Sequence, residues 1–551
     1  MIKEEKKAFV IFKKSLLFSL SIPFLLIYLQ QVFNFKEVKP LKGEFFPSLY
    51  SPLSDSSWFS GQYQDDANSF LNENFGFRNF FVRLKNQLDF SVFNKANARD
   101  VVAGKDNYLY MRGYIDAYYG RDFMGNKAIA DTVAKLKSLQ EDLKALHKTL
   151  LVLLAPSKAR VYPEYIPGYL IGPTPKNTNY ASFINEFEKA GINYIDFSNL
   201  YKLKKEKSDY LLFSQFGIHW SKLEAVRASD TMISKLNYIS GNRLQRIKVK
   251  AAVESDVLDG SEVDLLDPMN LFFTPPFKKM GTLEIEYLSE GAEKKNALVI
   301  GDSFWWEIYH QDIPRKVFAV NNFWYYNHDV YGNNLCEKGL AQNEDLKRTL
   351  LQFDIVILVV AESNYTIMGF GFIGAAASAI KKPIYPTSIE IDNIKKVIKA
   401  DTEWMSRLSA KAYQQKISVD SIITLNANWF FQQKGPLLKK VTIQDAKNSI
   451  LKDPVWLGQT EELAKEKKIT PDSALTEAAI WFLNNRFTPE EREITTDPIA
   501  EKFSIAELKQ KIKNDPQWMK AVIVQAKEKN ISLDSSLTIS ALWYIEQSRK
   551  K

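Results

Sequence analysis

The chain alternates between amphipathic helical patterns and short apolar runs. Apolar positions at helical spacing predict helices over residues 129–147, 180–190 and 221–236. Mostly apolar runs, typical of strands buried on both faces, are LLVLLAP at 150–156, INYIDF at 192–197, ALVIGDS at 297–303 and DIVILVVAE at 354–362. Alternation of this kind predicts an α/β fold, in which a parallel sheet carries helices on both faces.

Two other segments interrupt this alternation. Residues 57–100 read as helical, and their apolar positions recur at spacings of three, four and seven; these positions are Phe70, Phe77, Phe81, Leu84 and Leu88. VVAGKDNYLYMRG at 101–113 predicts a short β element with its turn at Gly104 to Asn107. Residues 250–290 look like a partly β insertion.

The N-terminus predicts a membrane anchor. Lysines at positions 3, 6, 7, 13 and 14 precede the apolar stretch SLLFSLSIPFLLIYL at 15–29. About 20 apolar residues cross a bilayer, and no small-residue cleavage site follows this one. A cleaved signal peptide or a buried core helix is the alternative. We expect a single pass through a bacterial inner membrane, with the bulk of the chain periplasmic.

The last third of the chain contains a repeat. The pattern D-x-x-W, followed by Ala, Ile, Asp-Ser and Trp-aromatic at fixed spacings, begins at Asp401, Asp453 and Asp515. Asp453 and Asp515 can each cap a helix whose first residue is Pro454 or Pro516. We expect three all-α repeats, at about 391–434, 443–486 and 505–548, whose tryptophans pack in a core; sugar-binding platforms are the alternative.

These patterns divide the chain into three parts. Residues 1–34 form the cytoplasmic tail and anchor, residues 35–388 the α/β domain, and residues 389–551 the helical repeats.

Composition excludes several classes of function. The formal charge is only +8 over 551 residues, and acidic and basic residues are interleaved, so nucleic-acid binding is not supported. The single cysteine, Cys336, rules out an intramolecular disulfide or a multi-cysteine metal site. We expect neither a metal nor a cofactor.

Two short motifs carry candidate chemistry. In ALVIGDSFWWEIY at 297–309, a buried strand leads into Ser303, at the edge where parallel sheets place their sites. In FGIHWSKLEAV at 216–226, His219 precedes a helix. Taken singly, each residue also has a structural explanation, since a lone histidine more often caps or fills a core.

Together the motifs resemble a family. GDSF at 301–304, preceded in the chain by xHW at 218–220, is similar to the SGNH-hydrolase-like O-acetyltransferases of the alginate AlgJ/AlgX type. FGFR at 75–78, VVAGKDNYLY at 101–110 and APSKARVYPEYIP at 155–167 add to the resemblance, which covers roughly residues 57–370. It implies an SGNH-like sheet with Ser303 as nucleophile and His219 as base.

The chain departs from the family at one position. The aspartate of the family's Asp-x-His motif falls on Gly217. Losing the equivalent group in a serine protease costs about 10⁴ in rate, so activity is in doubt. Asp209 and Glu307 are the candidates to orient His219 instead, while the side chain of Asp302 should point away from Ser303.

The remaining site predictions concern the oxyanion and the acceptor. Amides near Ser303 would hold the oxyanion, with support from Asp302 and Phe304 and from the side chains of Asn321 or Asn322. The candidate acceptor contacts are Trp220, Tyr325, Tyr326, Asn327 and Glu362.

The resemblance implies a covalent mechanism. An acetyl group would pass through an acetyl-serine at Ser303 to hydroxyls of an extracytoplasmic polysaccharide. It also implies a membrane-bound O-acyltransferase as the partner that supplies the acetyl group. A carbohydrate acetyl esterase and a non-catalytic polysaccharide-binding or scaffold protein are the alternatives.

Overall fold

The computed structural model covers most of the chain. It describes residues 2–43, 52–258, 260–288, 292–332, 337–437, 441–486, 492–493, 512–515, 518–520, 522–523, 537 and 540. Two compact units are present, one made of residues 1–330 with 340–436, the other of residues 331–339 with 437–551.

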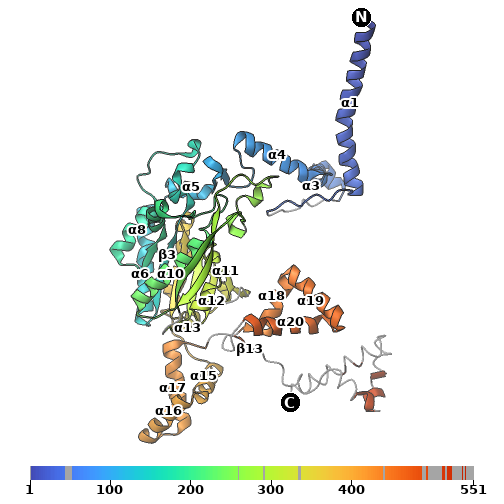
Figure 1. The fold of residues 1–551 in the computed structure, drawn as a ribbon. Coiled ribbons are helices and arrows are strands. Elements are labelled where there is room, and N and C mark those ends of the chain that lie inside the picture. The colour runs from blue at the N-terminus through green and yellow to red at the C-terminus, as the bar shows by residue number, and fades with distance from the viewer. Residues whose placement is uncertain are drawn as a thin grey trace. The chain divides into compact units, whose positions relative to one another are not determined.

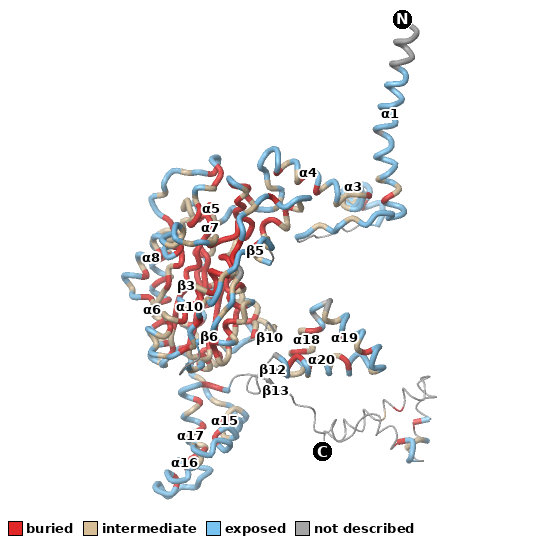
Figure 2. Tube along the Cα trace, viewed as in Figure 1, coloured by how far each residue is buried: buried red, intermediate tan, exposed pale blue. Residues whose placement is uncertain are grey.

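A mixed sheet forms the centre of the first unit (Figure 1). Its strand order is β10-β9-β8-β7-β11-β3-β4, and the neighbours from β8 to β4 are all parallel. The strands are β3 (Thr149–Ala155), β4 (Tyr194–Asp196), β7 (Ala297–Gly301), β8 (Asn321–Tyr325), β9 (Asp329–Tyr331), β10 (Glu337–Leu340) and β11 (Ile355–Ala361). The central strands are buried, as Figure 2 shows in red, which explains their continuous apolar runs and confirms the predicted α/β fold.

Two long helices, α6 and α10, pack against strand β3 of the sheet. Helix α6 also contacts α8 and α14, and α10 also contacts α11 and β5. The helices of this region are α5 (Arg112–Tyr118), α6 (Asn126–Ala145), α7 (Lys158–Val161), α8 (Asn179–Ala190), α9 (Phe197–Lys204), α10 (Lys222–Ser240), α11 (Phe304–His310), α12 (Ile313–Val317), α13 (Leu346–Gln352) and α14 (Phe372–Ala379).

Two antiparallel hairpins lie outside the main sheet. The predicted β element is formed by β1 (Val101–Ala103) and β2 (Leu109–Met111). The predicted insertion contains β5 (Arg246–Ser255) and β6 (Met280–Leu288). The described residues of the segment between β5 and β6 form short helical turns, and residues 261–265 of that segment reach the site described below.

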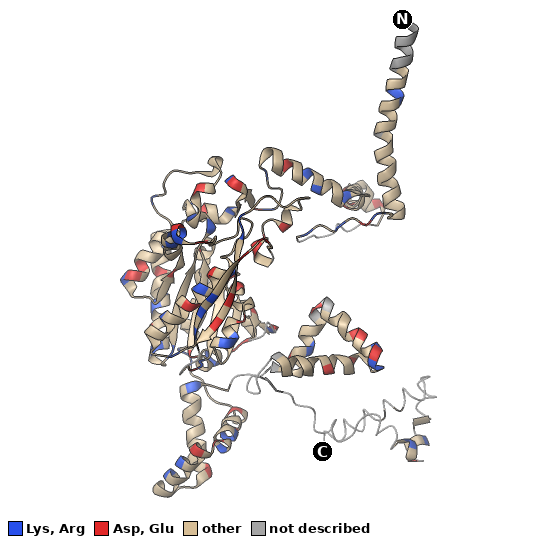
Figure 3. Ribbon diagram, viewed as in Figure 1, with Lys and Arg blue, Asp and Glu red and all other residues tan. Residues whose placement is uncertain are grey.

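The N-terminal region is helical. Helix α1 (Ile2–Phe33) contains a stretch, Val10–Phe33, that is long and apolar enough to cross a membrane, and beyond its N-terminal lysines it carries no charged residue (Figure 3). Then come α2 (Asp55–Phe59), α3 (Gln62–Asn74) and α4 (Arg78–Phe93), which confirm the helices expected over 57–100.

Helix α4 does not bury its apolar stripe. The stripe residues Phe81, Leu84 and Leu88 are exposed. The helix instead turns Arg83, Asn86 and Phe90 inward. Arg83 and Asn86 are buried because backbone carbonyls accept their hydrogen bonds, which offsets the cost of burying polar groups.

The first two repeats are helical, as predicted. The first copy contains α15 (Ser388–Ala400), α16 (Thr402–Gln415) and α17 (Val419–Lys434); the second contains α18 (Ile443–Lys452), α19 (Pro454–Lys467) and α20 (Pro471–Arg486), with β12 (Val441–Thr442) beside β13 (Arg492–Glu493). The repeated Asp caps a helix in all three copies, accepting from the backbone N–H of Trp404 at 2.8 Å, Trp456 at 3.1 Å and Trp518 at 3.0 Å. Most of the third copy lies outside the described residues.

The tryptophans of each copy do not share one environment. Trp404 and Trp456 pack against Phe430 and Phe482, as expected for core residues. The second tryptophans, Trp429 and Trp481, are 60% and 58% exposed, so core packing is wrong for them. The following aromatic residue of the pair takes the inward position. The boundary expected at residue 388 stays a prediction.

Candidate active site

Ser303 lies where β7 meets α11. Strand β7 ends at Gly301, and Ser303 is the residue that immediately precedes α11. A Cβ at Gly301 would lie 2.9 Å from Val359 Cβ on the neighbouring strand β11, so only glycine fits this close approach of two strands. The close packing of β7 against β11 therefore fixes the position of Ser303 just beyond the carboxyl end of β7.

His219 reaches Ser303 from a different part of the chain. It lies in the loop closed by the isolated bridge between Phe213 and Trp220, just before α10. Its Nε2 is 2.8 Å from Ser303 Oγ, which is hydrogen-bonding distance and lies within the separation expected for a nucleophile and its base. The catalytic roles of both residues stay predictions.

Aromatic packing fixes the plane of this imidazole. The ring of Phe304 meets His219 edge-on, with centroids 5.0 Å apart, and Trp220 packs on the other side of Phe304 at 5.5 Å. Phe304 and Trp220 are fully buried. Trp220 thus cannot touch an acceptor, which corrects its assignment as an acceptor contact; it supports the ring that supports His219.

Asp264 holds the other nitrogen of His219. Its Oδ2 is 2.9 Å from His219 Nδ1, and its Oδ1 accepts the backbone N–H of Ile218 at 2.9 Å. Neither Asp209 nor Glu307 takes this position, contrary to the expectation from sequence. Burial lowers the pKa of His219, but the hydrogen bond and the charge of Asp264 outweigh it, so this pKa lies above its ordinary value.

The segment that carries Asp264 fills the space where a side chain at residue 217 would lie. A Cβ built on Gly217 would collide with Ser261 O, and it would lie 3.2 Å from Glu262 Cα. Two hydrogen bonds hold the segments together, from Leu265 N to Phe216 O at 3.0 Å and from the Ser214 side-chain Oγ to Glu262 O at 2.6 Å. The absence of a side chain at Gly217 therefore leaves room for the segment that brings the Asp264 carboxylate to His219.

A buried lysine secures the loop before His219. Lys158 Nζ donates to Ser214 O and Gln215 O, each at 3.0 Å. Burial lowers the pKa of Lys158 to about 7, and the charge of Asp264 opposes that shift. This lysine belongs to the stretch APSKARVYPEYIP that sequence comparison singled out, and its position explains that stretch as a support for the histidine loop.

Asp302 is structural in its contacts. Its carboxylate accepts the N–H groups of Phe304 at 3.1 Å and Ala361 at 2.6 Å, and the side-chain amide of Asn364 at 2.9 Å. Burial raises the pKa of Asp302, and these three hydrogen bonds oppose it. The support role expected for Asp302 fits this geometry, whereas the amide of Phe304 is already engaged and so is not a donor for an oxyanion.

The two asparagines proposed as oxyanion donors lie at the wrong end of the sheet. In the register of β7 and β8, Asn321 pairs with Ala297 and Asn322 with Leu298, whereas Ser303 follows the opposite end of β7. The residue that does lie beside Gly301 is Tyr325.

Tyr326, the residue after β8, reaches Ser303. Its hydroxyl interacts with Ser303 and with Asn364, and burial raises the pKa of Tyr326 to about 12, so the hydroxyl is protonated near neutral pH. Asn327 donates to Phe370 O at 3.1 Å. Tyr325, Tyr326 and Asn327 remain candidates for acceptor contact.

Glu362 is not available to an acceptor. It is buried at the end of β11, and Arg160 Nε donates to its carboxylate at 2.9 Å. The guanidinium of Arg160 lies over the ring of Tyr180, 4.0 Å from its centroid. Because one buried ion pair satisfies the carboxylate, its assignment as an acceptor contact is wrong.

Asp264 and Asn364 were missed by reasoning from the sequence. Asp264 is 45 positions away from His219, in the insertion, and no spacing rule connects the two residues. Asn364 follows β11 in a region read only as the end of a strand. One signal existed: an unexplained glycine at 217 implies that another segment packs against it.

Comparisons with known proteins agree with the motifs. Residues 101–258 match the family model described as the SGNH hydrolase-like domain of the acetyltransferase AlgX. This range includes His219, whereas Asp264 and Ser303 follow it.

Curated relatives carry a related name. The chain is 26% identical over 189 residues to a probable alginate O-acetylase AlgJ of Pseudomonas syringae pv. tomato, covering 34% of this chain and 45% of the relative. It is 25% identical over 176 residues to the probable alginate O-acetylase AlgJ of Pseudomonas aeruginosa, covering 32% and 43%. The chain thus spans less than half the length of these relatives.

Among solved structures, the O-acetyltransferase domain of Pseudomonas putida AlgJ matches 51% of this chain and 99% of its own length, at 15% identity and a TM-score of 0.35. The family model and the curated relatives confirm the resemblance of this chain to SGNH hydrolase-like O-acetyltransferases of the AlgJ/AlgX type.

Proposed function

We propose that the protein is an O-acetyltransferase that forms an acetyl-serine at Ser303 and passes the acetyl group to a polysaccharide hydroxyl. The observation that carries the proposal is the continuous contact from Ser303 through His219 to Asp264, at 2.8 Å and 2.9 Å. Such an arrangement activates a serine hydroxyl, which is a weak nucleophile by itself.

The reaction proceeds in two halves. His219 Nε2 takes the proton of Ser303 as Oγ attacks the acetyl carbonyl carbon, and returns that proton to the leaving group of the donor as the acetyl-serine forms. An acceptor hydroxyl then gives its proton to His219 and attacks the acetyl carbon, and Ser303 Oγ recovers the proton. Asp264 stabilises the imidazolium in both halves.

Two side chains are proposed as donors to the oxyanion. The hydroxyl of Tyr326 interacts with Ser303 and Asn364. Asn364 uses its amide nitrogen to donate to Asp302, and that nitrogen has a second proton to offer. Asp302 thereby orients a donor instead of acting on the substrate.

The location and partners are part of the proposal. Helix α1 anchors the chain in the inner membrane, with the site on the periplasmic side, and a membrane-bound O-acyltransferase supplies the acetyl group. The alginate O-acetylase names of the relatives support an extracytoplasmic polysaccharide as acceptor.

Rapid mixing of the full-length protein with an activated acetyl ester tests the mechanism. We expect a mass increase of one acetyl group on the peptide that contains Ser303, and faster loss of that adduct when acidic oligosaccharides are added. Absence of any adduct, with intact folding, contradicts the proposal.

A carbohydrate acetyl esterase is the second candidate, because water can replace the acceptor at the same site. An esterase would hydrolyse acetylated sugars rapidly without an acceptor, and added oligosaccharide would not accelerate the turnover of the ester.

A further inference from the structure

Helix α4 is apolar on the side that faces away from the protein. Its exposed residues Phe81, Leu84, Leu88 and Val92 follow one another at spacings of three and four, so they share one face. That face lies opposite Arg83, Asn86 and Phe90, which are turned inward. Leu88 is 53% exposed and Val92 is 65% exposed.

Neighbouring aromatic residues widen this apolar face. The ring of Phe80 packs against Phe272, with centroids 5.2 Å apart, and Gln87 Oε1 accepts the backbone N–H groups of Phe272 and Phe273, each at 3.0 Å. Phe273 is itself exposed. We call the exposed residues Phe80, Phe81, Leu84, Leu88, Val92 and Phe273 the α4 face. Contiguous apolar surface of this kind marks an interaction site more often than isolated exposed residues do.

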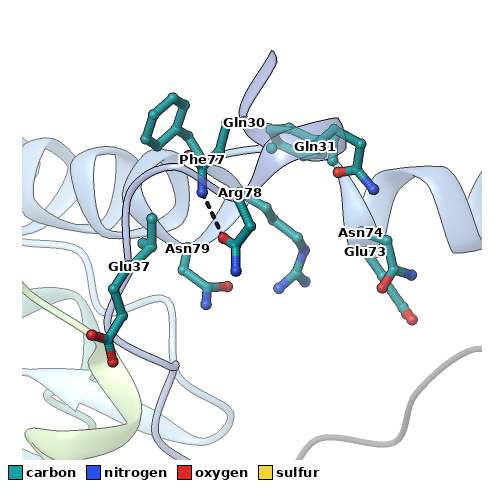
Figure 4. A pocket seen from close by; sticks show the side chains of 12 residues that line it. Gln30, Gln31, Glu37, Glu73, Asn74, Phe77, Arg78 and Asn79 are labelled. Carbon is teal, nitrogen blue, oxygen red and sulfur yellow. Dashed lines mark hydrogen bonds between the residues drawn. The ribbon is translucent and has the colours of Figure 1, made fainter. Parts of the chain in front are cut away.

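The α4 face begins beside the end of the candidate membrane span. A Cβ at Gly76, in the turn before α4, would collide with Ile27 O and would lie 2.8 Å from Gln31 N, so the turn rests directly on the last turns of α1. The rings of Phe35 and Phe77 meet edge-on at 5.8 Å. Figure 4 shows this junction, where Gln30 and Gln31 face Phe77, Arg78 and Asn79 across a pocket.

Polar contacts make the junction specific. Gln30 is buried and donates to Asn34 Oδ1 at 2.9 Å and to Lys36 O at 2.7 Å, which ends α1 and turns the chain. The guanidinium of Arg83 then donates to Lys39 O at 2.8 Å and to Pro40 O at 2.6 Å. The chain that leaves α1 is thus tied to α4.

We propose that the α4 face lies in the interfacial layer of the bilayer that α1 spans, so that the protein is attached by an interfacial helix as well as by its anchor. A bilayer that surrounds the span Val10–Phe33 has its headgroup layer near residue 33, the level at which the α3–α4 turn contacts α1. In Figure 1, α4 runs away from the end of α1 and not along it, so α1 does not cover this face.

The side chains present suit a lipid surface. Interfacial helices carry Trp, Phe and Leu on the lipid side and basic residues at the headgroups. Lys85 flanks Leu84 and Leu88 on the exposed side of α4, and Lys36 and Lys39 follow the span directly. The inference rests on the proposed anchoring by α1.

Depth-dependent fluorescence quenching tests the inference on the full-length chain. Because Cys336 is the only cysteine, single labelling sites are made in a C336S background: L26C in the anchor, L88C and V92C on the α4 face, and L203C on α9 as the control. Leu203 is an exposed leucine outside the α4 face, 65% exposed. Each protein carries an environment-sensitive fluorophore and is reconstituted into vesicles whose lipids bear a nitroxide near the headgroup.

We expect the fluorescence at positions 88 and 92 to fall to about half, as for a helix buried 5–10 Å into the interface, with no change at 203. Quenching at 26 but not at 88 and 92 would overturn the inference and leave the anchor intact. A loss of quenching at 26 would remove the anchor itself. A blue-shifted but unquenched signal at 88 and 92 would show that protein, not lipid, covers the face, and would also overturn the inference.

Discussion

The sheet edge at residues 301–304 and the segment at residues 260–270 each contribute an aspartate to the site, in opposite ways. Asp302 is fully buried, and its carboxylate accepts hydrogen bonds from Phe304, Ala361 and Asn364. Asp264 is partly exposed, and its carboxylate contacts Ile218 and His219. One aspartate shapes the loop that carries the proposed nucleophile, and the other contacts the proposed base. The difference teaches that proximity to Ser303 in the sequence does not identify the acid of the site.

Removing either end of the Ser303–His219 pair should have the largest effect. We expect Ser303→Ala and His219→Ala each to lower acetyl transfer by about 10⁴-fold or more, because the hydroxyl is then absent or not deprotonated. Acetyl release from a model ester by purified protein measures this, with circular dichroism as the control for folding. A residual rate near that of the wild type would remove both residues from the mechanism.

Replacing Asp264 should distinguish the role of its segment from that of the Asp302 loop most clearly. Asp264→Asn keeps the shape but not the charge, and we expect the rate to fall by about 10²–10⁴-fold with little change in stability. Glu307→Gln is the matched control, since Glu307 is a nearby carboxylate with no contact to the imidazole nitrogen that Asp264 binds. Equal losses in the two variants would contradict a specific role for Asp264.

Replacing Asp302 should mainly lower the stability of the folded protein. Asp302→Ala leaves the buried N–H groups of Phe304 and Ala361 without their acceptor, and we expect the free energy of unfolding to fall by about 2–5 kcal/mol. Urea unfolding at neutral pH measures this. If the variant unfolds like the wild type and only the rate changes, the contrast between the two aspartates is wrong.

Gly217 should tolerate no side chain. We expect Gly217→Ala to cost about 1–3 kcal/mol, because Ser261 O must move to admit a methyl group. The rate should fall as well, since Asp264 moves with that segment. Gly168→Ala is the control, because a Cβ there meets nothing within 4 Å. A Gly217→Ala protein as stable as the Gly168→Ala protein would contradict this packing.

The pH dependence should give the smallest effect. The hydrogen bond and charge of Asp264 raise the pKa of His219, and only the neutral imidazole acts as base, so kcat/KM should rise with pH through a midpoint above the ordinary histidine value. In Asp264→Asn burial is the main remaining influence and lowers the pKa of His219. The midpoint of the residual activity should therefore move to lower pH, and an unchanged midpoint would contradict the contact.

The sequence predicted the parts of the site that depend on periodicity. Buried parallel strands bring their carboxyl ends to one edge, so Ser303 at the end of β7 could be located from an apolar run alone. His219 followed from its motif. The acid could not be predicted, because Asp264 reaches the site through an irregular segment whose path depends on tertiary contacts such as Leu265 with Phe216.

The same limit applies to the apolar faces of helices. Periodicity indicates that a helix has an apolar face, but not what covers that face. In α4, hydrogen bonds from Arg83 and Asn86 to backbone carbonyls turned the polar side inward. In the repeats, Trp429 and Trp481 sit beside aromatic neighbours that took the core positions.

The contacts between the chain that follows α1 and residues 260–273 affect how a shortened protein would behave. Lys42 pairs with Asp267 at 2.6 Å and donates its backbone N–H to Asn270 at 2.8 Å, and Asn86 donates to Met269 O at 2.7 Å. This segment is the one that presents Asp264. Cutting the chain after residue 43 to obtain a soluble protein would therefore remove contacts that hold the segment carrying Asp264, the carboxylate proposed to orient His219. A slow truncated protein would then indicate a poorly held imidazole and not a poor choice of substrate.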